Sequence, residues 1–163
     1  EAQVRGRKNA RTWHRLPSGA GGMMEDESED ESEALCRRLA LRFPQIQPLL
    51  EAHLRADGDD PEDQELYPHI FFEREFGRWF KSLIASGSES DFRLARTIAG
   101  YLEESRAFAT EGGLLALLRV TFVEIFDYSV EAQKRVARIL GPTLLEDYRE
   151  FLQIGRASCR ERV

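Results

Sequence analysis

Apolar residues recur along the chain at intervals of three and four positions, and the strict alternation typical of a half-buried strand is nearly absent. The three-to-four spacing places apolar side chains on one face of an α-helix. The pattern therefore predicts seven helices joined by mostly short loops. Their expected ranges are 32–43, 46–56, 67–86, 91–108, 111–128, 130–140 and 143–153.

Residues that favour helix ends fall between these ranges. Asp30 followed by Glu33 forms a capping-box pattern, and Ser88 followed by Asp91 forms another. Ser129 is a third expected N-cap. Pro68 suits a first helical turn, Gly87 suits a C-terminal stop, and Gly141-Pro142 separates the last two helices.

The range 111–128 is apolar on almost all sides, unlike its amphipathic neighbours. A helix of this kind is normally enclosed by other helices, so we expect it at the centre of the fold. Helices joined by short loops lie antiparallel. The predicted fold class is all-α, either a compact bundle or a short solenoid-like stack of antiparallel helical hairpins, in a single helical domain at 34–153.

The two ends of the chain differ from this domain in composition. The last ten residues, "IGRASCRERV" at 154–163, resemble the translation of a sequencing adapter, and we expect them to be a disordered, adapter-derived tail. Residues 1–22 hold five basic residues and one acid, have no apolar repeat and precede Met23-Met24, so we expect a non-native leader or a disordered segment. The acidic run at 23–33 is also expected to be disordered.

Charge limits the classes of partner. Between residues 23 and 153 there are 15 Arg and Lys against 27 Asp and Glu, a net charge of −12, whereas the whole chain carries −6. Such a surface disfavours nucleic acid and anionic membranes and favours a basic protein partner. Only Cys36 is a cysteine within this span, no apolar run is long enough to cross a membrane, and we expect a soluble cytoplasmic protein.

The sequence contains no recognisable catalytic, cofactor-binding or metal-binding motif. His69 and Glu73 are four positions apart on a predicted helix, but a metal site needs a third ligand, and His53 lies on another helix. The simpler interpretation is that His69 packs at a helix start and Glu73 is solvated. Cys36 has no neighbouring base and is expected to be a small core residue. We therefore predict no catalytic residue, no cofactor and no metal.

Arg119 and Glu124 interrupt the apolar helix at 111–128. They lie either on a narrow exposed stripe or at the border of a groove where a partner docks. In the second case Phe71 and Trp79, with Tyr67, could supply aromatic anchors, since aromatic side chains dominate many binding hot spots. The candidate partner-binding residues are Arg119, Glu124, Trp79, Phe71, His69 and Glu73.

Four segments, "FPQIQPLLEAHL", "LYPHIFFEREFGRWF", "LLRVTFVEIFD" and "ILGPTLLEDY", resemble a family of uncharacterised bacterial proteins with a small all-helical domain of unknown function, over roughly 39–152. The resemblance implies a cytosolic accessory protein, of the kind that neutralises a toxin. Our leading hypothesis is a non-enzymatic acidic module that binds a basic protein. The alternatives are a small enzyme or ligand-binding domain, whose pocket would bring together His69, Glu73 and Glu124, and a homodimer formed through the aromatic helix at 67–86.

Overall fold

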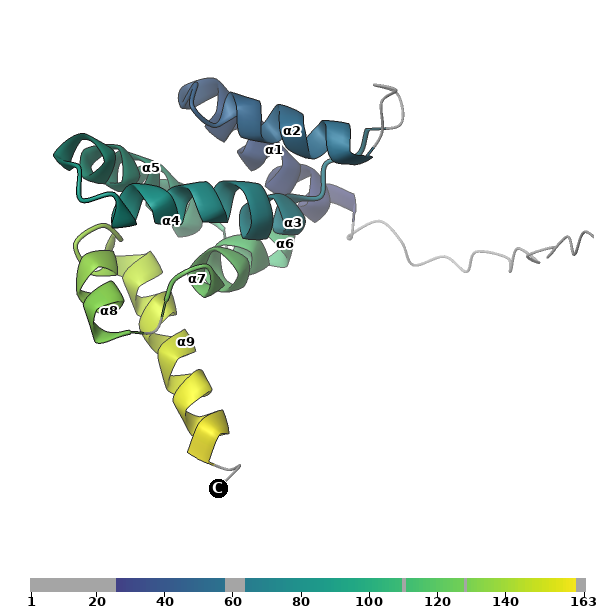
Figure 1. Cartoon of the computed structure of the whole chain (residues 1–163). Helices are drawn as coiled ribbons and strands as arrows, with labels where there is room; N and C mark the ends of the chain where they lie inside the picture. Colours follow the sequence, from purple (N-terminus) through teal and green to yellow (C-terminus); the bar gives the residue numbers. More distant parts are fainter. Residues whose placement is uncertain (1–25, 58–63, 110, 128, 161–163) are drawn as a thin grey trace, which may run out of the picture.

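A computed structural model of the chain describes residues 26–57, 64–109, 111–127 and 129–160, and every regular element in these ranges is helical (Figure 1). The all-α prediction is confirmed. Five helices are single pieces: α1 (Asp26–Arg42), α2 (Gln47–Asp57), α5 (Glu89–Phe108), α8 (Val130–Val136) and α9 (Pro142–Arg160). No helix in the described ranges is both long and apolar enough to cross a bilayer.

The other two predicted helices each consist of three consecutive pieces, with a π-helical turn in the middle. The first is α3 (Pro68–Phe71), η1 (Phe72–Phe76) and α4 (Gly77–Ala85). The second is α6 (Gly112–Ala116), η2 (Leu117–Thr121) and α7 (Phe122–Glu124). Counted this way, the described part of the chain forms the seven helices that the apolar pattern predicts.

Several predicted helix ends are confirmed by their geometry. The Asp91 amide donates to Ser88 Oγ over 3.5 Å, and the Ala132 amide donates to Ser129 Oγ over 3.2 Å. Pro68 is the first residue of α3. Gly87 has a φ of 72°, in the left-handed region that favours glycine, and it ends the turn between α4 and α5.

The two three-piece helices pack against each other through phenylalanine rings at the centre of the molecule. Phe80 lies 5.6 Å from Phe122 and 6.1 Å from Phe126, measured between ring centroids, and all three side chains are at most 3% exposed. Helix α6–η2–α7 also contacts α1, α5 and α9. The prediction that the apolar helix lies at the centre is confirmed.

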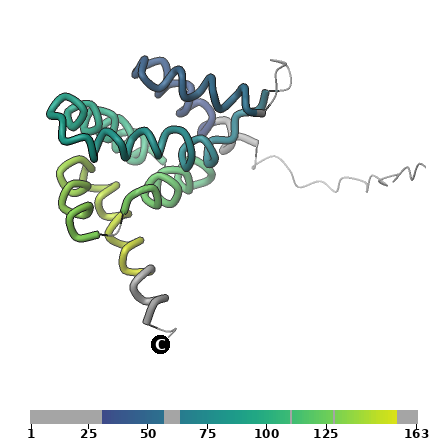
Figure 2. Tube along the Cα trace, viewed as in Figure 1, coloured from purple at the N-terminus to yellow at the C-terminus, as the bar shows by residue number. Residues whose placement is uncertain are grey.

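Helices α1 and α2 form an antiparallel hairpin that lies over α3–α4 (Figures 1 and 2). The start of α1 and the end of α2 are therefore at the same, open end of this hairpin. Helix α9 packs against α7, and α8 lies below the end of α4 in Figure 1.

The helical ranges extend beyond the prediction at both ends. Helix α1 begins at Asp26 rather than after Asp30, inside the segment 23–33 expected to be disordered. Ser32 is already buried. Helix α9 continues to Arg160, into the expected tail at 154–163. The expected leader at 1–22 lies outside the described residues.

Candidate functional site

The two π turns meet where the aromatic helices contact each other. Gly77 makes this close approach feasible: a Cβ added there would lie 2.4 Å from the Phe72 carbonyl oxygen and 2.9 Å from Ile125 Cγ2. A side chain at this position would therefore collide with the π turn itself and with α7. Single π turns inside α-helices occur frequently at functional sites, so the surface beside η1 and η2 is the first place to look for one.

A surface hollow of about 690 Å³ lies beside the π turns, between η1 and α4 on one side and η2 and α7 on the other. This volume is within the range of small-molecule sites, about 300–1,000 Å³. Its lining is mainly polar, with Ile125 as the apolar exception beside Gly77. The other lining residues are His69, Glu73, Arg74, Arg78, Lys81, Thr121 and Glu124.

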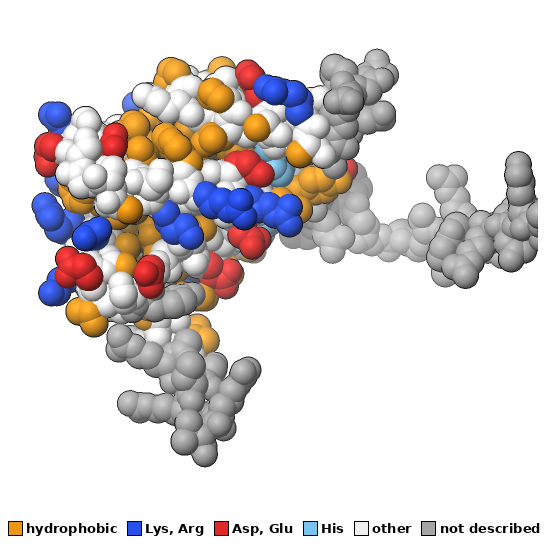
Figure 3. All heavy atoms as spheres, viewed as in Figure 1, with side chains coloured by type: hydrophobic (Ala, Val, Ile, Leu, Met, Phe, Trp, Pro, Cys, Tyr) orange, Lys and Arg blue, Asp and Glu red, His pale blue; other side chains and the backbone are white. Residues whose placement is uncertain are grey.

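One wall of the hollow is cationic. Arg74, Arg78 and Lys81 follow each other at spacings of four and three, which places them on one face of η1–α4. All three are exposed, and none takes part in an ion pair or hydrogen bond with another described residue. Figure 3 shows Lys and Arg side chains gathered over this helix, with acidic side chains beside them. The spacing of these three cations is visible in the sequence, but their position on the wall of a hollow is not.

The rest of the polar lining carries two carboxylates, Glu73 of η1 and Glu124 of α7, and one hydrogen bond between helices. Glu73 and Glu124 are exposed, and no other described residue forms an ion pair with either of them. His69 Nδ1 and Thr121 Oγ1 share a hydrogen bond of 2.6 Å, which joins α3 to η2 at one end of the hollow. The ligand-binding alternative requires a concave pocket where at least two of His69, Glu73 and Glu124 meet, and all three line this one hollow.

Three of the six candidate residues, Phe71, Trp79 and Arg119, do not line the hollow. Phe71 is completely buried beneath His53 and Phe72, so it cannot be an aromatic anchor for a partner. Trp79 packs against the hydrophobic core and is only partly exposed. The expectation that these rings face a partner is wrong for Phe71 and is not supported for Trp79, because both point toward the phenylalanine cluster.

Arg119 is also separate from the hollow, although it is only five residues from Glu124. Its Nη2 donates to Glu150 Oε2 over 2.5 Å, and its Nε lies 3.4 Å from Asp147 Oδ1. The hydrogen bond with Glu150, together with the charges of Glu150 and Asp147, raises the pKa of Arg119 above its ordinary value. Arg119 therefore attaches η2 to α9.

Among the described residues, histidine and carboxylate side chains do not assemble into a metal centre. His53 is buried, and its Nδ1 lies 3.1 Å from Glu75 Oε2, on the other side of η1 from the residues that line the hollow. Within the described ranges, no three His, Cys, Asp or Glu side chains are close enough to hold a metal ion.

Cys36 is fully buried in the core, as its sequence context predicts. Burial, reinforced by the negative charge of Glu33, raises the pKa of its thiol to about 12. A thiol with such a pKa holds almost no thiolate near neutral pH, so Cys36 is unsuited to nucleophilic chemistry.

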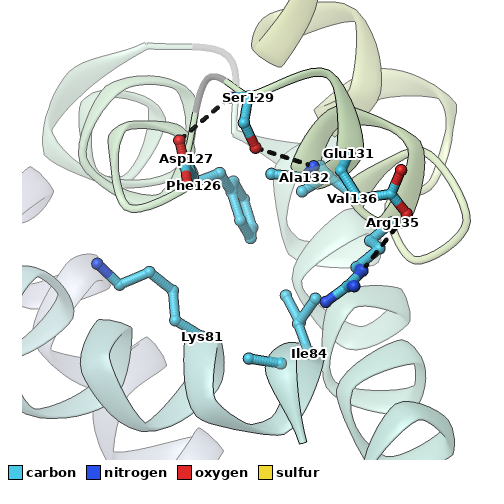
Figure 4. A pocket seen from close by; sticks show the side chains of 10 residues that line it. Lys81, Ile84, Phe126, Asp127, Ser129, Glu131, Ala132, Arg135 and Val136 are labelled. Atoms are coloured by element: carbon cyan, nitrogen blue, oxygen red, sulfur yellow. Dashed lines mark hydrogen bonds and ion pairs between the residues drawn. The ribbon is translucent and has the colours of Figure 1, made fainter. Parts of the chain in front are cut away.

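A second hollow, of about 300 Å³, lies between the end of α4 and α8, and Phe126 and Ile84 point into it (Figure 4). Its polar rim is largely engaged within the fold. Asp127 accepts a hydrogen bond from the Ser129 amide, and Glu131 lies 3.9 Å from Arg135. Because these groups already have partners, the larger hollow beside the π turns is the better candidate for a binding site.

Comparisons with models of protein families, with curated proteins and with solved structures find no match to this chain.

Proposed function

We propose that this protein is a non-enzymatic cytoplasmic module that uses two acidic segments to bind a basic protein partner. The supporting observation is the distribution of its charge. Residues 31–56, 64–109, 111–127 and 129–154 together contain 17 acidic and 15 basic residues, which nearly balance. Ten further acids fall within 25–30 and 57–63, where no basic residue occurs.

In the chain, these two segments adjoin the same end of the α1–α2 hairpin. Helix α1 begins at Asp26 and α2 ends at Asp57, and the two helices pack as an antiparallel hairpin. A concentration of one charge at one end of a protein speeds the encounter with an oppositely charged partner and helps to exclude like-charged proteins. Ten of the acidic residues behind the net charge of −12 therefore belong to one proposed binding surface, at this end of the hairpin.

The test is a capture experiment with neutralised variants. The loop variant replaces four acids of the second segment by amides: Asp59→Asn, Asp60→Asn, Glu62→Gln and Asp63→Asn. The matched control replaces four exposed acids of the folded surface: Glu89→Gln, Glu104→Gln, Glu111→Gln and Glu146→Gln. We expect the unmodified chain and the control to retain a basic protein at about 50 mM salt and to lose most of it at about 300 mM, where screening is stronger.

The loop variant is expected to retain much less of the same protein at the lower salt concentration. Mass spectrometry of the captured fractions identifies the protein and its isoelectric point. Equal retention by the loop variant and the control, or capture that salt does not weaken, would contradict the proposal.

A second candidate function, the binding of a small ligand, is supported by one specific observation: His69, Glu73 and Glu124 line the same hollow. Its test is a ligand screen followed by NMR, in which amide signals of α3, η1 and η2 report on the hollow. Saturable shifts confined to those elements would support ligand binding there, and a screen that shifts only amides elsewhere would contradict it.

A further inference from the structure

The cations on one wall of the hollow beside the π turns repel one another, and a bound anion would relieve that repulsion. Arg74 and Arg78, at a spacing of four, and Arg78 and Lys81, at a spacing of three, are neighbours on the helix surface, where like charges repel. An anion that binds the folded state would relieve this repulsion. Arg93 and Arg96 of α5 are also exposed without an ion pair to another described residue, but they do not line this hollow.

The carboxylates in the hollow restrict the kind of anion. Glu73 and Glu124 would repel a ligand that consists only of negative charge, but they can accept hydrogen bonds from hydroxyl groups. Arginine side chains bind phosphate oxygens through paired N–H donors, and lysine adds a further positive charge. The lining therefore combines a phosphate-binding wall with acceptors for hydroxyl groups.

We infer that this hollow binds a small phosphate monoester that carries several hydroxyl groups, such as a sugar phosphate. Arg74, Arg78 and Lys81 contact the phosphate, which carries a charge of roughly −1.5 to −2 at neutral pH. Glu73 and Glu124 accept hydrogen bonds from the hydroxyl groups. The volume of about 690 Å³ leaves room for a ligand of this size together with water. The inference rests on the second candidate function and names its ligand class.

The experiment is an NMR titration of the whole chain with three probes: ribose 5-phosphate, inorganic phosphate and ribose. We expect ribose 5-phosphate to shift amide signals of η1, α4 and η2 in a saturable way, and to bind about tenfold more tightly than inorganic phosphate. Ribose alone is expected to cause no saturable shift. If the two phosphates bind equally well, the hydroxyl contacts to Glu73 and Glu124 are refuted.

Matched variants assign the contacts. Arg74→Gln with Arg78→Gln is expected to weaken ribose 5-phosphate binding by about tenfold or more. The control Arg93→Gln with Arg96→Gln removes two exposed arginines of α5 whose side chains form no ion pair or hydrogen bond with another described residue, and it should leave binding unchanged. Glu73→Gln with Glu124→Gln should reduce the preference for ribose 5-phosphate over inorganic phosphate.

The inference is overturned if neither phosphate shifts these signals, or if both arginine pairs weaken binding equally. If a ligand screen finds only molecules without phosphate in this hollow, the inferred ligand class fails while small-ligand binding stands. Neither result affects the capture of a basic protein, because the acidic segments are unchanged in these variants.

Discussion

Gly77 is the residue on which the packing of the two aromatic helices depends most directly. The space for a Cβ is taken by the Phe72 carbonyl oxygen at 2.4 Å and by Ile125 Cγ2 at 2.9 Å. Since the first of these atoms belongs to the backbone of the π turn, it cannot rotate away. The second atom belongs to Ile125, which follows α7 and lines the hollow, so Gly77 also lets the start of α4 lie close to the end of α7.

Replacing Gly77 by alanine should destabilise the protein by about 1–3 kcal/mol, because the added methyl group overpacks this contact. Gly100, which is exposed in α5 with nothing within 4 Å of an added Cβ, is the matched control. Gly100→Ala should stabilise the protein by about 0.5–1 kcal/mol. Urea unfolding of both variants measures the difference, and equal effects of the two substitutions would contradict this description of Gly77.

The raised pKa of the Cys36 thiol predicts that the free energy of unfolding depends on pH. Its thiol pKa is about 12 in the folded protein and about 9.0 in the unfolded chain. Between these values only the unfolded chain releases the proton, so the free energy of unfolding falls as pH rises, by up to about 1.4 kcal/mol per pH unit. Urea unfolding from about pH 8 to about pH 10.5 should give a steeper fall for the natural residue than for Cys36→Ala. Identical slopes would show that this thiol titrates normally.

At the scale of the helices, α9 is fixed by side chains from two others. Glu103 of α5 accepts hydrogen bonds from the amides of Thr143 and Leu144, over 2.7 and 2.9 Å, and so caps the start of α9. Asp147 of α9 is bound by Arg106 of α5 through two hydrogen bonds of 2.7 and 3.1 Å.

Glu103→Gln should cost about 0.5–2 kcal/mol of stability, the range for the loss of a helix N-cap, because the amide group accepts at only one of its two ends. Glu104 is adjacent and exposed, so Glu104→Gln is a close control and should change stability by less than about 0.5 kcal/mol. Thermal unfolding of the two variants tests the cap. An equal loss of stability in Glu104→Gln and Glu103→Gln would show that Glu103 does not cap α9.

Asp147→Asn should be more costly, at about 3 kcal/mol, because it leaves the Arg106 guanidinium, which is only 15% exposed, without its carboxylate. The side chain of Arg119 is 47% exposed, so Arg119→Ala should cost at most about 1 kcal/mol. Chemical denaturation ranks the two variants, and the reverse order would show that the ion pair with Arg106 is not the main support of α9.

The helices themselves were predictable from local signals, while the features that shape the site were not. Ser88 and Ser129 cap their own helices, and the apolar spacing is a property of neighbouring residues, so both can be read along the chain. The π turns and the cap supplied by Glu103 depend on residues brought together from distant positions, Glu103 being 40 residues before Thr143. Adjacent Glu103 and Glu104 look alike in the sequence, yet only the first contacts α9.

In the candidate site, too, some features follow from local sequence and others from contacts between distant residues. Its cations at 74, 78 and 81 share a helix face that the spacing alone defines, but the hollow exists only because η2 and α7 pack beside that face. Conversely, Phe71 looks like its exposed neighbours Tyr67 and Ile70 in the sequence and is buried in the structure. The sequence pattern alone cannot tell which of these neighbours is buried, because burial here depends on contact with α2, whose His53 ring packs against Phe71.

For the whole molecule, the central claim is that the net negative charge acts at one end, beside the start of α1 and the end of α2. The folded surface elsewhere carries nearly equal numbers of acids and bases. The most direct measurement is an NMR titration of the chain with a short arginine- and lysine-rich peptide at low salt.

We expect saturable shifts in the described residues next to the two acidic segments, Glu31, Ser32, Gln64 and Glu65, and little change at the exposed acids Glu104 and Glu146 of the folded surface. Shifts of equal size at Glu104 and Glu146 would mean that the peptide binds acidic side chains indiscriminately. That result would contradict a dedicated acidic binding surface.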